Sequence, residues 1–115
     1  MARLVVDAVV RPTGPGVGLV VAITGDDDGV PRSGLSPAAF TLMAIPPDDA
    51  TSPQPCFVTD AMEGPPGVYR LSLDPLPPWA MTAPRRVIFS LAVRGEAEGG
   101  WADDLGHALV VATLP

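Results

Sequence analysis

Apolar and polar positions alternate strictly over residues 67–74 of the chain. Tyr69, Leu71 and Leu73 alternate with Arg70, Ser72 and Asp74. Because successive side chains of a strand point to opposite faces, this period of two predicts a half-buried strand. Residues that interrupt regular structure bound it, namely Pro65, Pro66 and Gly67 on one side and Pro75, Pro77 and Pro78 on the other. We therefore expect Tyr69, Leu71 and Leu73 to lie in the core.

Similar short apolar runs, separated by turns rich in Gly and Pro, recur along the chain and predict further strands. The predicted strands span residues 4–10, 18–24, 40–45, 56–62, 67–74, 85–93 and 107–114. In the sixth strand the expected inward set is Val87, Phe89, Leu91 and Val93. A single helical turn is expected from Ser36 to Ala39, with Ser36 as N-cap and Pro37 at the first helical position.

Seven strands without an amphipathic helix predict an all-β fold, a seven-stranded immunoglobulin-like (Greek-key) β-sandwich, with a β-barrel as the alternative. A length of 115 residues predicts one domain, residues 1–115. The chain is 47% hydrophobic but only 5% aromatic, so Val, Leu and Ala must build most of the core. The 15 Pro and 12 Gly residues fall mainly between the apolar runs, as expected of turns.

Two segments resemble bacterial immunoglobulin-like domains. Residues 29–40, GVPRSGLSPAAF, are similar to their Gly-x-Pro-x-x-Gly-Leu segment, which leads through a small turn to a Phe that starts a strand. Gly67-Val68-Tyr69 resembles their later Gly-x-Tyr strand, and residues 85–93 the long strand after it. The chain departs from antibody-type domains because it lacks paired cysteines and its first tryptophan, Trp79, follows five predicted strands. The resemblance implies a sandwich used for spacing or binding.

Charge and apolar patterning exclude several classes of partner. The net charge is −6, Arg is the only basic side chain besides the single His, and Arg85-Arg86 is the only basic pair. This balance argues against binding to nucleic acid or to anionic membrane surfaces. No apolar run approaches the ~18 residues of a membrane span, and the N-terminus does not read as a signal peptide. With a single cysteine, Cys56, we expect a cytoplasmic protein.

Asp26-Asp27-Asp28-Gly29 supplies oxygen ligands of the kind that calcium prefers. An EF-hand loop needs Glu at its twelfth position, which is Pro37 when counted from Asp26. Asp and Gly are also ordinary turn residues, so we predict no metal site. A module that binds carbohydrate or calcium through its end loops remains the alternative function.

No residue pattern predicts catalysis or a cofactor. His107, the only histidine, opens a strand and lacks a predicted nucleophile in reach, and Cys56 reads as a small buried residue. The loop carboxylates Glu63, Glu96 and Glu98 have no predicted cleft between them. Residues 14–18, GPGVG, lack the helix that follows a phosphate-binding loop. We therefore expect a protein that is not an enzyme.

The two terminal strands suggest an interface. Val5 and Val9 lie on the polar face of the first strand, and residues 108–114 are apolar on both faces. If the chain ends pair in one sheet, their outward residues form an apolar patch of the kind that marks interfaces. The predicted interface residues are Val5, Val9, Ala108, Val110 and Ala112. The function predicted is protein binding or a structural role in a homo- or hetero-oligomeric assembly.

Overall fold

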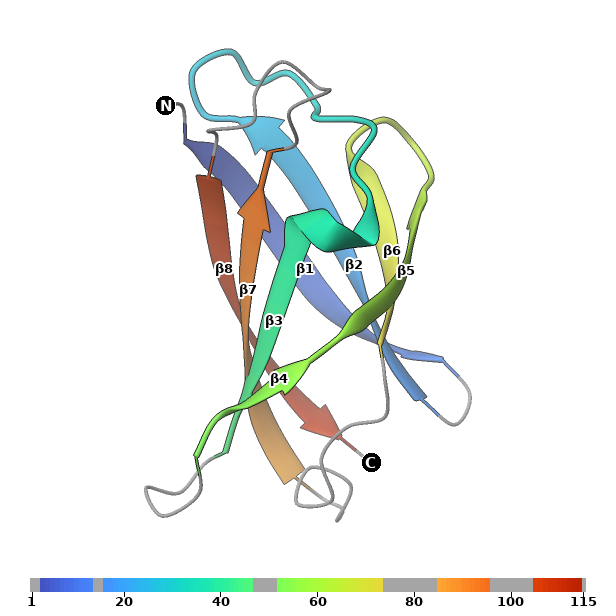
Figure 1. The fold of residues 1–115 in the computed structure, drawn as a ribbon, viewed down its shortest axis with the longest axis vertical. Coiled ribbons are helices and arrows are strands. Elements are labelled where there is room, and N and C mark those ends of the chain that lie inside the picture. Colours follow the sequence, from blue (N-terminus) through green and yellow to red (C-terminus); the bar gives the residue numbers. More distant parts are fainter. Residues whose placement is uncertain (1–2, 14–15, 47–51, 74–84, 96–104, 115) are drawn as a thin grey trace.

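Two antiparallel four-stranded sheets face each other in the computed structural model, which describes residues 3–13, 16–46, 52–73, 85–95 and 105–114 (Figure 1). Within β-strands, the side chains of residues 12–13, 16–17, 85–87 and 112–114 are not described. The strands are β1 (Leu4–Thr13), β2 (Gly16–Gly25), β3 (Phe40–Ile45), β4 (Gln54–Cys56), β5 (Val58–Glu63), β6 (Val68–Leu73), β7 (Arg85–Arg94) and β8 (Leu105–Leu114). The predicted all-β class and the sandwich of two sheets are confirmed.

Strands β1-β2-β6-β5 form one sheet, here called the β1 sheet, and β4-β3-β7-β8 form the other, the β8 sheet. The described residues thus contain eight strands where seven were predicted. The predicted strand 56–62 is interrupted at Phe57, which is 64% exposed. The chain ends β4 in the β8 sheet and starts β5 in the β1 sheet there, as strands do at the corner of a sandwich.

Alternation predicted the inward residues correctly for Tyr69 and Leu71 of β6, which are buried and pair with Val21 and Leu19 of β2. In β7, Phe89, Leu91 and Val93 are buried as predicted, and the side chain of Val87 lies outside the described residues. Phe40 of β3 is buried as well. The rings of Phe40 and Tyr69 meet edge to face at 5.5 Å, which joins the two sheets. Leu73, predicted to be buried, is half-buried.

The predicted helical turn is present as a 3₁₀ turn over Pro37–Ala39 with Ser36 at the N-cap. Its backbone is closed by the Ala39 N–H, which donates to the Ser36 carbonyl at 3.0 Å. The described residues contain no helix that is long and apolar enough to cross a membrane.

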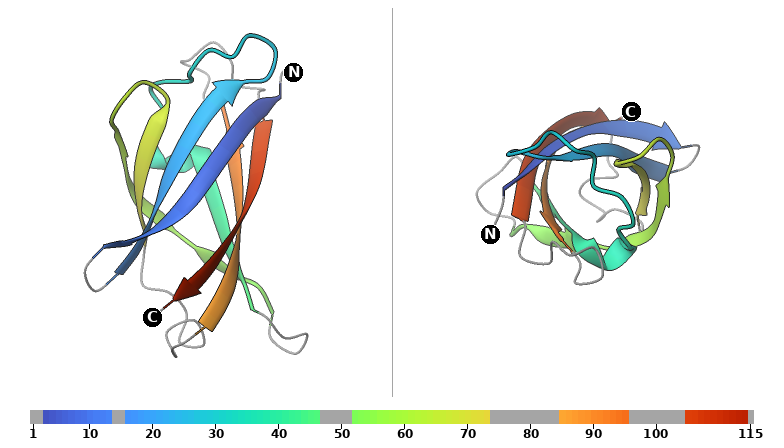
Figure 2. Two further views of the ribbon diagram at one scale, coloured as in Figure 1. Left: turned by 180° about the vertical axis from the view of Figure 1, so that it is seen from behind. Right: turned by 90° about the horizontal axis from the view of Figure 1, so that it is seen from above.

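The chain ends do not pair within one sheet, which corrects the expectation from the sequence. β1 and β8 are edge strands of different sheets, and among the described residues the one backbone bridge between the two sheets at this seam is the isolated parallel bridge of Arg3 with Leu105. Figure 2 shows the two strands together at the end where both begin and further apart toward the end of β8. Gly106 permits the approach, since a Cβ on it would lie 2.6 Å from Val6 Cγ2 and 2.8 Å from Leu4 Cβ.

Candidate protein-interaction face

Strand β8 presents the opposite residues to solvent from those predicted. Val110 is 4% exposed, whereas Leu109 is 64% and Val111 57% exposed. Val110 pairs with the buried Phe89, and paired residues of a ladder point to the same side of the sheet. Val110 therefore belongs to the core, and its predicted outward orientation is wrong. Ala108 shares its side and is half-buried, and the side chain of Ala112 lies outside the described residues.

Val5 and Val9 of β1 do point outward, with exposures of 39% and 61%. Their neighbours on the same face of β1 are the exposed charged residues Asp7 and Arg11. Exposed Asp60 and Arg70 extend the charged pattern across β5 and β6. The outer face of the β1 sheet is thus a mixed, solvated surface, on which Val9 pairs with Val20 and lies between Asp7 and Arg11.

The outer face of the β8 sheet lacks such charges over its central part. The exposed Leu109 and Val111 pair with Ser90 and Ile88 of β7, which in turn pair with Met43 and Ile45 of β3. The next row of paired residues lies toward the end of the sandwich where β1 and β8 begin, here called the upper end. Together these rows are called the uncharged face, which consists of Thr41, Met43, Ile45, Pro55, Ile88, Ser90, Ala92, His107, Leu109 and Val111. It contains no Asp, Glu, Lys or Arg. Contiguous apolar surface of this kind marks interaction sites.

A groove of about 560 Å³ opens at the upper end of the uncharged face, where β1 approaches β8. Arg3, which directly precedes β1, and Arg94 of β7 line it from either side of Leu105, and His107 lies below them on β8. Among the described residues, no carboxylate lies within ion-pair distance of either guanidinium. Two guanidinium groups therefore border this groove in the part of the chain that the structure describes.

His107 is exposed, as predicted, and its Nε2 atom lies 2.8 Å from Ser90 Oγ. No sequence pattern predicted this pair, because it depends on the register of β7 against β8. A Ser–His nucleophile needs a third group that orients the imidazole. The described residues that share the groove with His107 offer arginines, Thr41 and apolar side chains but no carboxylate. The contact that the structure describes is a hydrogen bond between neighbouring strands.

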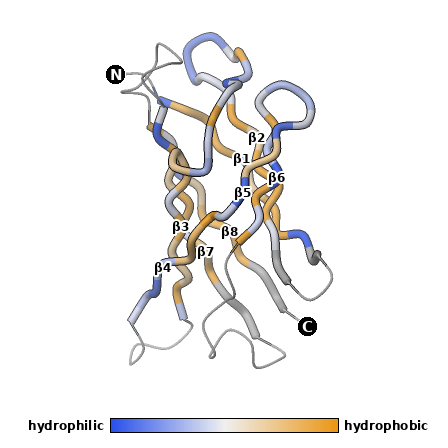
Figure 3. Tube along the Cα trace, turned by 45° about the vertical axis from the view of Figure 1, so that its right-hand side comes forward, coloured by the Kyte–Doolittle hydropathy of each residue, from blue (hydrophilic) through white to orange (hydrophobic). Residues whose placement is uncertain are grey.

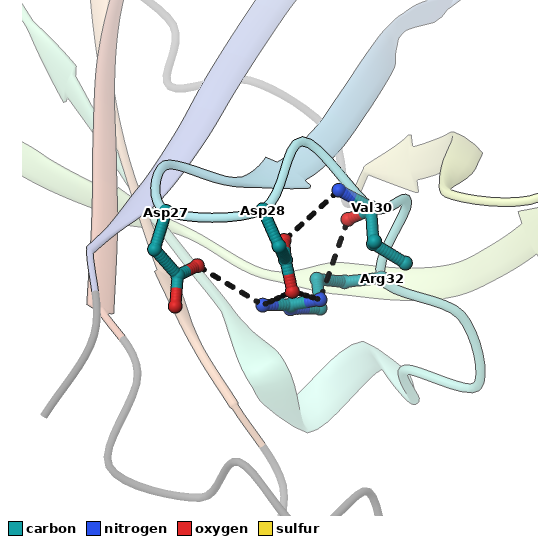
Figure 4. Close-up of polar contacts among 4 residues, drawn as sticks. All are labelled: Asp27, Asp28, Val30 and Arg32. Atoms are coloured by element: carbon teal, nitrogen blue, oxygen red, sulfur yellow. Dashed lines mark hydrogen bonds and ion pairs between the residues drawn. The ribbon is translucent and has the colours of Figure 1, made fainter.

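The Asp-rich loop after β2 is organised by an arginine (Figure 4). Arg32 Nη1 and Nη2 each donate to Asp28 Oδ2 at 3.3 Å, and Nη2 lies 3.7 Å from Asp27 Oδ1. The Val30 N–H donates to Asp28 Oδ1 at 2.9 Å and, with Arg32, holds the pKa of Asp28 below its ordinary value of 3.8. Arg32 thus provides the positive charge that a calcium ion would otherwise bring. Figure 3 shows this loop as a hydrophilic segment above the strands.

Two core-facing polar groups fix the neighbouring loops. Glu63 accepts hydrogen bonds from the N–H groups of Gly67 at 2.9 Å and Gly34 at 3.1 Å, and the bond from Gly67 is the main reason that the pKa of Glu63 is lowered. The Tyr69 hydroxyl donates to the Arg32 carbonyl at 2.6 Å and accepts from the Leu35 N–H at 3.2 Å. Glu63, predicted only as a loop carboxylate, is therefore a structural acceptor.

Of the remaining candidate groups, Cys56 is buried, as expected, and burial raises the pKa of its thiol, which disfavours the reactive thiolate. Glu96 and Glu98 lie outside the described residues. In the part of the chain that the structure describes, no three His, Cys, Asp or Glu residues are placed to hold a metal ion.

Comparisons with known proteins give no relative. No protein-family model, no curated protein sequence and no solved structure matches the chain.

Proposed function

We propose that the protein is a non-enzymatic binding module with an immunoglobulin-like sandwich, and that it docks onto a partner protein through the uncharged face. The observation that carries this proposal is the contrast between the two sheets. The β1 sheet intersperses its exposed apolar residues with charges, whereas the uncharged face holds Leu109 and Val111 beside Ile88 and Ser90, with no charged side chain among its own described residues. Along a strand with one solvent-exposed face, polar residues occupy the exposed positions. An outer face without charges is therefore more typical of a surface that a partner protein covers.

The order of the strands supports the immunoglobulin-like part of the proposal. Immunoglobulin domains place strands A, B, E and D in one sheet and C, F and G in the other. Numbered in chain order, β1-β2-β6-β5 corresponds to the first set and β3-β7-β8 to the second, with β4 as an additional edge strand. Domains of this architecture serve many functions, so the function here is argued from the surface and not from the fold.

The size of the uncharged face sets the strength of binding. The uncharged face covers five residues on each of β3, β7 and β8, which is about 17 Å along the strands and about 15 Å across the four strands. Its area is therefore about 250 Å², and with the matching area of a partner the interface would bury about 500 Å². This is below the ~1,200 Å² of a standard specific complex, so binding through this face alone is weak, and carboxylates of the partner near Arg3 and Arg94 would strengthen it.

The test compares two matched valines. Val111→Asp places a charge in the uncharged face, whereas Val9→Asp places one on the β1 sheet at nearly the same exposure, 61% against 57%. Immobilised wild type and both variants are exposed to extract of the source cells, and the bound proteins are quantified by mass spectrometry, with light scattering to detect self-association. We expect partners, or the self-associated form, to be lost in Val111→Asp and retained in Val9→Asp.

Circular dichroism and thermal unfolding serve as the control that both variants remain folded. The proposal is wrong if folded Val111→Asp retains every bound protein that the wild type retains, or if the wild type is monomeric and captures nothing specific.

A further inference from the structure

The four edge strands of the two sheets differ in how they are protected against pairing with another chain. An edge strand presents a row of unpaired backbone N–H and C=O groups, and proteins guard such edges with short strands, charges, proline or bulges. β4 has three residues, one of them Pro55. β5 carries Asp60 and Glu63, and its register shifts between Val58 and Asp60. Both outer edges on this side of the sandwich are therefore guarded.

On the other side, the two edge strands have equal length but different protection. β1 contains Asp7, Arg11 and Pro12, so charge and a missing N–H guard its edge. β8 has ten residues, LGHALVVATL, without an acidic or arginine side chain and without proline. Its ladder with β7 continues over all ten pairs without a bulge. β8 is thus the one edge of the described sheets that carries none of these devices.

The neighbouring strand β1 covers only the beginning of this edge. The bridge between Arg3 and Leu105 and the contact of Gly106 with Leu4 and Val6 lie at the start of β8. Beyond that point β1 diverges from β8 (Figure 2), and no described strand pairs with residues 109–114 of β8 on that side. The exposed Leu109 and Val111 of the uncharged face lie in this open stretch.

We propose that the edge of β8 over residues 109–114 accepts an extended segment of a partner protein as an additional strand of the β8 sheet. This inference rests on the proposed function and specifies the partner's chemistry. The segment has apolar, preferably β-branched, residues at every second position, because those side chains lie beside Leu109 and Val111 on the uncharged face. It is free of proline, since its backbone must bond to the edge of β8.

A second copy of the chain fits this edge less well. Two copies of a six-residue stretch would meet along about 20 Å, with a sheet thickness of about 10 Å, so pairing buries about 400 Å² in total. A specific dimer needs about 1,200 Å² or more. Each copy also carries a net charge of −6, which opposes association of two copies. A separate extended segment derives its affinity from main-chain hydrogen bonds and needs less area.

The test uses a capped heptapeptide of alternating Thr and Val as the probe, and the same peptide N-methylated at alternate residues as the control. The two peptides share their side chains, but the second lacks the N–H groups of one edge. Binding to the full chain is followed by amide shifts and hydrogen exchange in NMR spectra. We expect slowed exchange at alternate amides of residues 109–114, those that do not face β7, and an affinity at least about tenfold lower for the N-methylated peptide.

A pair of proline variants tests the same edge from the side of the protein. Of two adjacent strand residues, one directs its N–H toward β7 and the other toward the open edge. One of the two variants Val111→Pro and Ala112→Pro therefore removes an N–H that points to the open edge and not to β7. That variant should keep the fold, because edge strands tolerate proline where the N–H faces solvent. We expect that folded variant to bind the unmodified peptide at least about tenfold more weakly than the wild type.

The outcomes separate this inference from the proposed function. Equal affinity for the two peptides, or a folded proline variant that binds as well as the wild type, overturns strand addition while the Val111→Asp test of the face still stands. Lack of peptide binding at millimolar concentration also overturns strand addition. A mass that doubles without peptide, together with concentration-dependent protection of residues 109–114, overturns the choice of a partner segment in favour of a second copy.

Discussion

Replacing Gly106 by Ala tests the seam between the two sheets. The added Cβ would lie 2.6 Å from Val6 Cγ2, 2.8 Å from Leu4 Cβ and 3.0 Å from the Leu4 carbonyl oxygen. Val6 Cγ2 can turn away, but the two Leu4 atoms belong to the backbone or are attached to it, so β1 and β8 must separate. Overpacking of this kind costs about 1–3 kcal/mol. The lower conformational entropy of the unfolded Ala variant offsets about 0.4–1 kcal/mol of this cost. We therefore expect a net destabilisation of about 1.3 kcal/mol, within a range of about 0–2.6 kcal/mol.

The assay is urea unfolding followed by far-ultraviolet circular dichroism, and Gly64→Ala is the matched control. No atom lies within 4 Å of a Cβ at Gly64, and this glycine does not have a positive φ. Gly64→Ala should therefore be neutral or slightly stabilising. The midpoint of Gly106→Ala should fall at an unchanged slope. If both variants unfold at the same urea concentration, the close contact between β1 and β8 does not exist in solution.

Three further predictions concern the interior and its polar groups. Tyr69→Phe leaves the Leu35 N–H without its acceptor and should lower the free energy of unfolding by about 1–3 kcal/mol, and an unchanged urea midpoint would contradict this. The pKa of Glu63 is lowered in the folded protein, so its contribution to stability is present above its ordinary pKa of 4.5 and is lost as the pH falls through the folded value; Glu63→Gln should flatten this acid limb of a stability–pH curve, and an identical limb in both proteins would refute the role of Glu63. Leu71→Ala should cost about 2–5 kcal/mol, whereas a loss below about half a kcal/mol would mean that Leu71 is not in the core.

The alternation of apolar and polar residues predicted the buried side chains correctly where the two faces of a strand differ in polarity. β6 and β7 place most of their large apolar residues on one side and mainly small or polar residues on the other, with Val68 and Ile88 as exceptions. The buried residues of these two strands followed directly from that contrast. β8 is apolar on both sides, so parity could not choose between Val110 and Leu109. Only the pairing of Val110 with Phe89 settles the choice, and that register is a tertiary property.

The interruption of the predicted strand 56–62 could not be foreseen, because nothing in the local sequence indicates that Phe57 turns the chain from one sheet to the other. The Asp-rich loop was expected to be a turn without a metal ion, but the contact with Arg32 was not predicted, because it forms only after the chain has turned back. The uncharged face likewise exists only once β3, β7 and β8 are side by side. A sequence pattern can predict which residues of one strand share a face, whereas an interaction surface forms from residues of several strands that the fold brings together.

The parallel course of β1 and β8 has a mechanical consequence. β1 begins at one end of the 41 Å long axis and β8 finishes at the opposite end (Figure 1). Tension applied between these two points acts along the strands, so it loads the ten-pair ladders of β1 with β2 and of β8 with β7 in shear. In that geometry many hydrogen bonds must give way together, whereas pulling across a ladder would open them one at a time. A chain placed in series through its two ends would therefore resist stretching along its length more strongly than its modest size suggests.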